Sequence, residues 1–122
     1  MGDIRLSRVY DHEPTSRGKT FLVERLWPRG VSRKDVHLDD WCKDVAPSTE
    51  LRKWFAHDPA KWSEFQRRYV RELDAHPHAW QPLVDAASDG DVTLVYSSRD
   101  REHNNAVVLR DYLLSRLRND AS

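Results

Sequence analysis

The sequence predicts an α/β protein with a small, mostly parallel three-stranded sheet flanked by helices. Two short apolar runs, Phe21-Leu22-Val23 and VTLVY at 92–96, are typical of strands buried on both faces. A long segment with helical patterns separates them, and parallel pairing requires a connection of this kind. The second run is followed by a polar turn and a last helical segment, which is the order found in open α/β sheets.

The first part of the chain predicts two strands. Residues 4–10 form the first, because apolar side chains alternate there, and residues 11–19 form a loop, since Pro, Ser and Gly occur close together. Residues 20–26 form the second strand, which Pro28 and Gly30 end. The loop is also short enough for an antiparallel hairpin, so the pairing of these two strands stays open.

The middle of the chain predicts helices. Ser32 or Asp35 can cap a helix that runs through Trp41 and Val45, and a short helix carrying Leu51 follows.

The clearest helix begins after Asp58, an N-cap candidate with Pro59 at the first helical position. An apolar stripe at spacings of three and four marks its buried face: Trp62, Phe65, Tyr69 and Leu73. His76-Pro77 ends this helix, and another follows up to Asp89-Gly90. The last predicted helix, after the 92–96 strand, has its own apolar face: Ala106, Leu109, Leu113 and Leu117.

Composition narrows the class of protein. With 122 residues and no internal repeat, residues 1–122 are predicted to form one domain. Lys and Arg number 20 and Asp and Glu number 20, which argues against bulk attraction to nucleic acid but leaves a local basic patch possible. The single cysteine, Cys42, fits a reducing compartment, and no apolar run approaches the ~20 residues of a membrane span. We therefore expect a cytoplasmic protein that does not associate with a membrane.

The stretch ERLWPRG, residues 24–30, predicts one side of a binding site. If residues 20–26 and 92–97 are parallel neighbours, their carboxyl ends bring this stretch beside the polar segment SSRDREHNN. Arg25 and Arg29 could then hold an anion such as a phosphate, because guanidinium groups match its geometry. Trp27 could supply a stacking face.

The polar segment predicts the other side of this site. His103 is the candidate acid–base group, with Asp100 or Glu24 to orient it, and Asn104 could donate from its amide. Simpler roles stay open for the same residues: Asp100 as a helix N-cap, His103 as a first-turn residue, and Arg25 in a structural ion pair.

Other candidate sites are weaker. His57 and His76-x-His78 lack a recognised metal-ligand spacing, so no metal is predicted. Ser97, with Asp100 and His103, has the residue types of a catalytic triad, but sequence neighbours seldom reach that geometry. The sequence names neither a cofactor nor an oligomeric state.

Three stretches together carry a resemblance: ERLWPRG, WCKDVAPSTELRKWFAHDPAKWSEFQRRY and VTLVYSSRDREHNNAVVL. In this order and spacing, from about residue 4 to residue 114, the chain resembles the YeaO-like proteins, a bacterial family described as the domain of unknown function DUF488. The resemblance implies a Rossmann-like α/β fold and no assigned activity. It departs from the family pattern at Glu24, where Asp is expected, and at Cys42, where an aliphatic residue is usual.

The resemblance also implies further site candidates. The family's fingerprint falls on Arg8, Tyr10, Arg25, Trp27, Pro28, Arg29, Gly30, Lys43, Ala46, Pro47, Ser48, Leu51, Arg52, Phe55, His57, Tyr96, His103 and Asn104. From these, Lys43, Ser48, Arg52 and Tyr96 join the predicted ligand-binding set. The simpler roles are an N-cap for Ser48 and a structural contact for Arg52.

The sequence thus predicts a pocket for an anionic small molecule, such as a nucleotide or a phosphorylated metabolite, with acid–base hydrolysis or transfer by His103 as its sharper version. The alternative is a non-enzymatic module that binds protein or nucleic acid through the basic run from Arg67 to Arg71. In that alternative the strand-end residues would be dispensable.

Overall fold

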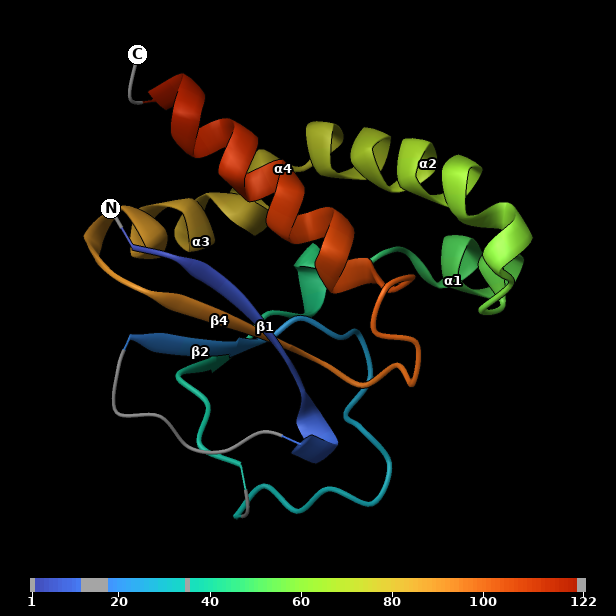
Figure 1. The fold of residues 1–122 in the computed structure, drawn as a ribbon, viewed down its shortest axis with the longest axis horizontal. Coiled ribbons are helices and arrows are strands. Elements are labelled where there is room, and N and C mark those ends of the chain that lie inside the picture. The colour runs from blue at the N-terminus through green and yellow to red at the C-terminus, as the bar shows by residue number, and fades with distance from the viewer. Residues whose placement is uncertain (1, 12–17, 35, 121–122) are drawn as a thin grey trace.

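A computed structural model of the protein describes residues 2–11, 18–34 and 36–120. Its sheet has four strands in the order β1-β4-β2-β3, and every neighbouring pair is parallel (Figure 1). The strands are β1 (Ile4–Arg8), β2 (Lys19–Leu22), β3 (Asp40–Trp41) and β4 (Val92–Tyr96). The predicted α/β class is confirmed, with one strand more than the three expected.

The central strand β4 lies between β1 and β2. Val92 is the register partner of both Ile4 and Lys19, so the two flanking strands start level with each other. Because β1 and β2 lie on opposite sides of β4, they do not form the hairpin that the sequence left open. Residues 12–17 of the predicted first loop lie outside the described residues.

The predicted α-helix through Trp41 and Val45 is wrong for the part of that segment that the structure describes, where β3 and a 3-10 turn, Lys43–Val45, are found instead. The edge of β2 explains this difference, since its backbone groups need partners. Asp39 N donates to Thr20 O (2.8 Å) and Cys42 N donates to Leu22 O (2.8 Å). The Asp39 side chain also accepts from Thr20 N (2.7 Å). Asp35, the alternative cap of that helix, lies outside the described residues.

The remaining predicted helices are confirmed. They are α1 (Thr49–Phe55), α2 (Trp62–Ala75), α3 (Pro77–Asp89) and α4 (Asn105–Asp120). Asp58 Oδ1 accepts from Ala60 N as predicted for a cap (3.0 Å), but the first turn, Pro59–Lys61, is a 3-10 turn, and α2 begins after it. None of the helices in the described ranges is long and apolar enough to span a membrane.

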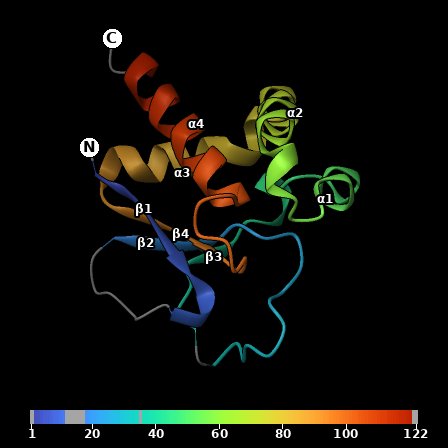
Figure 2. The ribbon, with the colours of Figure 1, turned by 45° about the vertical axis from the view of Figure 1, so that its right-hand side comes forward.

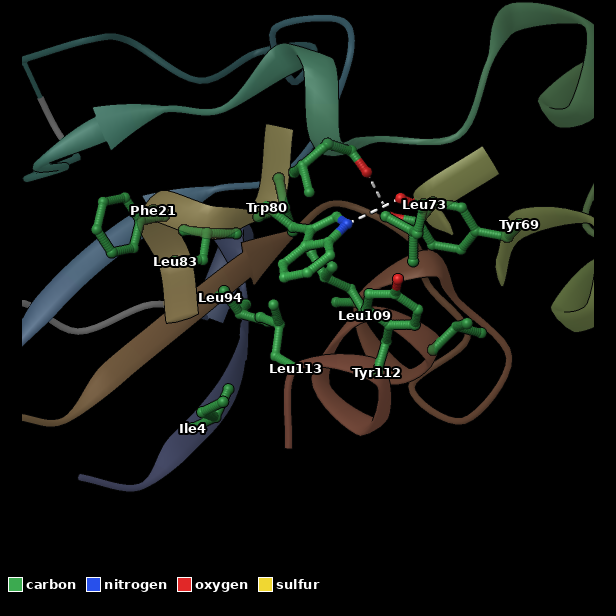
Figure 3. Packing of buried hydrophobic residues seen from close by; sticks show 14 of the residues in the cluster. Ile4, Phe21, Tyr69, Leu73, Trp80, Leu83, Leu94, Leu109, Tyr112 and Leu113 are labelled. Atoms are coloured by element: carbon green, nitrogen blue, oxygen red, sulfur yellow. Dashed lines mark hydrogen bonds between the residues drawn. The ribbon is translucent and has the colours of Figure 1, made fainter. Parts of the chain in front are cut away.

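The main core lies between the sheet and the helices. Figure 2 shows all four helices on the same side of the sheet. The apolar stripe of α2 faces this core as predicted: Phe65, Tyr69 and Leu73 are buried, with Tyr69 fully enclosed, and Trp62 is partly buried. Figure 3 shows two hydrogen bonds from buried aromatic side chains of this core: Trp80 Nε1 donates to Leu73 O (2.8 Å), and Tyr69 Oη donates to Val45 O (2.6 Å). Buried polar groups with partners of this kind fix the packing of α2 against its neighbours.

The opposite face of the sheet has a much smaller core. Leu22 and Val95 point to this side, while their strand neighbours point to the main core, as expected for a period of two. A small group of partly buried side chains covers them: Trp27, Val31, Val36, Leu38 and Trp41. A long loop after β2 therefore replaces helices on this face.

Candidate functional site

A cavity of about 290 Å³ opens near the carboxyl ends of β2 and β4. Three segments line it: the residues after β2, helix α1 with the turn that follows it, and the segment from the end of β4 to the start of α4. Figure 1 shows how the order of the sheet brings these distant segments to one end of the molecule. The cavity therefore lies where parallel α/β sheets generally bind ligands.

Glu24, which follows β2, hydrogen-bonds at this cavity to the residue that follows β4. Its Oε1 accepts from Ser97 N (2.9 Å) and from Ser97 Oγ (3.2 Å). Its Oε2 has no hydrogen-bond partner in the described part of the chain. Burial raises the pKa of Glu24, and the two Ser97 bonds and the charges of Arg52 and His57 act in the opposite direction.

Basic residues on α1 and the turn after it line the same cavity. They are Arg52, Lys53 and His57. The turn has an uncommon backbone, since Ala56 and His57 both have left-handed φ values of 48° and 57°. Such a conformation costs about 1 kcal/mol or more per residue with a side chain. This strained turn places His57 at the cavity.

The segment after β4 holds His103 through Asp100. Oδ2 of Asp100 lies 2.9 Å from Nδ1 of His103, and Oδ1 accepts from the N–H groups of Glu102 and His103 (both 2.9 Å). These bonds, led by the one from Glu102, lower the pKa of Asp100. The His103 ring also contacts Trp62 edge to face, with centroids 5.2 Å apart. Its Nε2 has no partner among the described residues.

The start of α4 also lines the cavity. Asn104 is buried, and its side chain hydrogen-bonds to the backbone: Nδ2 donates to Asp100 O (2.9 Å) and Oδ1 accepts from Val107 N (3.1 Å). Asn104, rather than Asp100, therefore caps this helix. Nδ2 of Asn105 donates to Val23 O (2.8 Å). The backbone N–H groups of Asn105 and Ala106 find no acceptor in the described ranges, as is common at a helix start.

The arginines and the tryptophan of ERLWPRG lie apart from this cavity. Arg25 donates through Nε to Pro47 O (3.1 Å) and through Nη2 to Ala46 O (3.0 Å). Trp27 belongs to the small core and donates to Val31 O (2.7 Å). The Arg29 side chain is exposed, and its carbonyl accepts from Tyr10 Oη (2.8 Å). Parallel pairing of β2 and β4 was correctly predicted, yet it does not bring these side chains to His103.

The candidates taken from the resemblance divide in the same way. Arg52 lines the cavity. Ser48 caps α1, since its Oγ accepts from Leu51 N (3.1 Å), and Tyr96 is buried in the main core. Nζ of Lys43 lies 4.1 Å from the centre of the Trp41 ring. Ser97 and Asn105 were missed as members of the site, because a serine or asparagine beside a strand end gives no specific signal before the sheet order is known.

Metal and thiol chemistry find little support. No group of three or more His, Cys, Asp or Glu side chains could hold a metal ion within residues 2–11, 18–34 and 36–120. Burial raises the pKa of the Cys42 thiol to about 12, so it stays protonated and is a poor nucleophile.

Fold and cavity together define a parallel α/β protein with a small, charged cavity at the strand ends. The chain belongs to the family described as the inactive DUF488-N3 subclade, which matches residues 3–122. This finding confirms the YeaO-like DUF488 resemblance. The chain is 42% identical to the uncharacterized protein YeaO of Escherichia coli over 113 residues, which cover 93% of this chain and 98% of that protein. It is 38% identical to the uncharacterized protein Rv3073c of Mycobacterium tuberculosis, covering 93% and 95%. No solved structure gives a significant match.

Proposed function

We propose that this chain binds a small anionic molecule, such as a nucleotide or a phosphorylated metabolite, in the cavity between α1 and the start of α4. One observation carries the proposal. Arg52 lines the cavity, and no residue of the described ranges accepts a hydrogen bond from its guanidinium group. Guanidinium donors form paired hydrogen bonds with phosphate or carboxylate oxygens, so this group is suited to an anionic ligand.

Other donors around the cavity support the same charge. Lys53 and His57 lie on the side of Arg52, and His103 lies on the segment that precedes α4. The unpaired N–H groups of Asn105 and Ala106 begin a helix of 16 residues, whose amino end carries a partial positive charge. Cationic side chains and a helix start around one cavity would together compensate the charge of a phosphate.

The walls supply contacts for the rest of a ligand. Apolar side chains line the cavity between its polar groups: Leu26, Pro47, Phe55 and Phe65. Leu26 is 64% exposed, which is unusual for so large an apolar side chain and is explained if a ligand covers it. An apolar lining with a few convergent polar groups is the usual composition of small-molecule sites.

Binding without turnover is the form of the proposal that we favour. The family's description calls its subclade inactive. Asp100 and His103 are arranged as an oriented acid–base pair, but in a binding role the same pair would hold the imidazole toward an anion. We therefore propose that Arg52 and His103 bind the ligand, rather than catalyse hydrolysis or transfer.

The alternative surface on α2 has less free charge than its sequence suggested. Glu64 pairs with Arg67 (2.6 Å) and with Arg68 (3.2 Å), and Arg68 also stacks over the Trp54 ring at 4.2 Å. Part of the charge of this face is therefore already balanced by Glu64. We keep the cavity as the proposed site and use α2 as the comparison in its test.

The test is thermal melting with inorganic phosphate, a sugar phosphate and AMP, at constant ionic strength. A ligand that binds only the folded state raises the melting temperature, and at 100 times its Kd it stabilises by about 2.7 kcal/mol. We expect a shift with at least one of these probes, lost in Arg52→Ala and kept in Arg67→Ala.

Two results would contradict the proposal. No shift with any anion would remove the ligand class. An equal loss of the shift in both variants would show a general charge effect instead of a site. A salt-sensitive association with nucleic acid that is lost only in Arg67→Ala would favour the α2 surface.

A further inference from the structure

The cavity contains opposite charges that do not touch each other. Glu24 and Arg52 both line it, and they interact through space without a direct ion pair. Oppositely charged groups inside proteins usually pair or bind something else, because an isolated charge out of water is costly. Here each group keeps binding capacity toward the cavity: Glu24 has a free Oε2, and Arg52 has its guanidinium donors.

Ser97 fixes how Glu24 presents this oxygen. Both of its hydrogen bonds go to Oε1, so the carboxylate is held by one oxygen and the other is left for a partner. Four influences favour its charged form: two bonds from Ser97 and the charges of Arg52 and His57. Burial is the largest influence and raises the pKa of Glu24, and these four act against it. Once the carboxyl group is ionised, Oε2 can accept a hydrogen bond only from a partner other than Ser97.

A ligand with only negative charge matches one part of this arrangement, the donors of Arg52, but leaves Glu24 without a partner. It would satisfy Arg52 but would bring its charge close to the Glu24 carboxylate, which is unfavourable at short range. A metal ion is also a poor match for Glu24, because the described residues offer no cluster of three ligands. The remaining match for Oε2 is a hydrogen-bond donor on the ligand itself.

We infer that the ligand of this cavity combines an anionic group, bound at Arg52, with an N–H donor such as an ammonium group, bound at Oε2 of Glu24. This inference rests on the proposed function, and it narrows the ligand class to small zwitterions or amino-substituted phosphates. In this arrangement Glu24 selects anions that also carry an N–H donor. Ser97 positions Glu24, and its hydroxyl donates to Glu24 rather than to the ligand.

The test compares two probes that differ only in the donor: O-phosphoethanolamine and ethyl phosphate. Each is titrated into the ¹⁵N-labelled protein at pH 7 and constant ionic strength, and Kd is taken from amide shifts. Hydrogen bonds to a charged group are the stronger kind, so we expect phosphoethanolamine to bind about tenfold more tightly. The shifts should include the amides of Ser97 and Asn105.

The Glu24→Gln variant shows whether Glu24 causes the preference. Its amide oxygen can still accept from Ser97, but its NH₂ group would point to the cavity as a donor. We therefore expect the variant to lose the preference or to favour ethyl phosphate. The matched control is Glu50→Gln, an exposed position on α1 that does not line the cavity, which should keep the wild-type preference.

The outcomes separate the two proposals. Equal binding of both probes by the wild type would leave the anion site standing and overturn the zwitterion inference. A preference that persists in Glu24→Gln would overturn it as well, since another residue would then select the donor. Binding of neither probe would contradict the anion site and the inference together. If Glu24→Gln fails to fold, the Kd values of the two probes for the wild type still show whether the cavity prefers a ligand with an N–H donor.

Discussion

Two cavities among the described residues differ in how their polar groups are used, and the larger of the two is the less suited to a ligand. The larger, of about 530 Å³, is lined among others by Arg25, Ser48, Tyr69 and Glu72. All four have hydrogen bonds within the protein; Glu72, for example, accepts from Ser48 N (2.8 Å) and from Ser48 Oγ (2.6 Å). We call this group the scaffold cluster.

The smaller cavity has polar groups with capacity left over, on Glu24, Arg52 and His103. The difference teaches that volume alone is a poor guide to function. In the scaffold cluster the polar groups stabilise the fold, whereas in the smaller cavity they can bind something else. Substitutions in the two places should therefore affect different quantities.

The largest expected effect is on stability in the scaffold cluster. Arg25→Ala removes a charged donor from the carbonyl groups of Ala46 and Pro47. We expect a loss of about 3 kcal/mol in the free energy of unfolding, measured by urea denaturation, because hydrogen bonds from charged groups contribute about 1.5–3 kcal/mol each. Arg25→Lys should recover only part of it, since lysine lacks the planar fork. A stable Arg25→Ala that no longer binds ligand would contradict the comparison.

A smaller loss is expected at the cap of α1. Ser48→Ala removes the acceptor of Leu51 N and one of the two bonds to Glu72. We expect a loss of about 1–2 kcal/mol in the same measurement, which combines a lost cap with a lost bond to a carboxylate. Ser63→Ala, on the exposed side of α2, is the control and should change little. If both variants were equally stable, the contact between Ser48 and Glu72 would carry no weight in the fold.

Glu24 lines the smaller cavity, and its burial should also make the stability of the protein depend on pH. Burial raises its pKa in the folded state, so between its unfolded and folded pKa values the folded protein binds more protons. Stability from this group is then present at low pH and is lost as pH rises through that window, which begins near 4.5. Relative to wild type, Glu24→Gln should gain stability from pH 4 to pH 7, measured by thermal melting. A constant difference across this range would show that burial of Glu24 is not the dominant influence.

The smallest effect on stability is expected at Arg52. Arg52→Ala breaks no hydrogen bond within the described residues, so the free energy of unfolding should change by about 0.5 kcal/mol or less. Ligand affinity should fall in the same variant by tenfold or more. A large loss of stability at Arg52 would place it with the scaffold cluster.

The sequence predicted the fold better than the site. The patterns of α2 and β4 were clear because their apolar side chains repeat with the period of the structure they form. The strand β3 could not be predicted, because its two residues are held by the free edge of β2 rather than by a pattern of their own.

The prediction of the site was wrong about which arginine lines the cavity. Arg25 and Glu24 are neighbours in the sequence, yet only Glu24 lines the smaller cavity, while Arg25 turns to the carbonyl groups of residues 46–47. Adjacent residues of an extended chain point to opposite sides, so the two side chains could not share one site. The arginine of the cavity came instead from α1, at Arg52.

The central position of β4 has a consequence for how the chain folds. Val92 pairs with both Ile4 and Lys19. Among the described strands β1 pairs only with β4, so it has no partner until a loop of nearly ninety residues has closed. Contacts so distant in sequence are slow to form, since chain entropy is lost before they contribute. Glu24 also meets Ser97 only across this closure. During synthesis, the first three quarters of the chain would leave the ribosome before the sheet could form, and the smaller cavity would be among the last features to assemble.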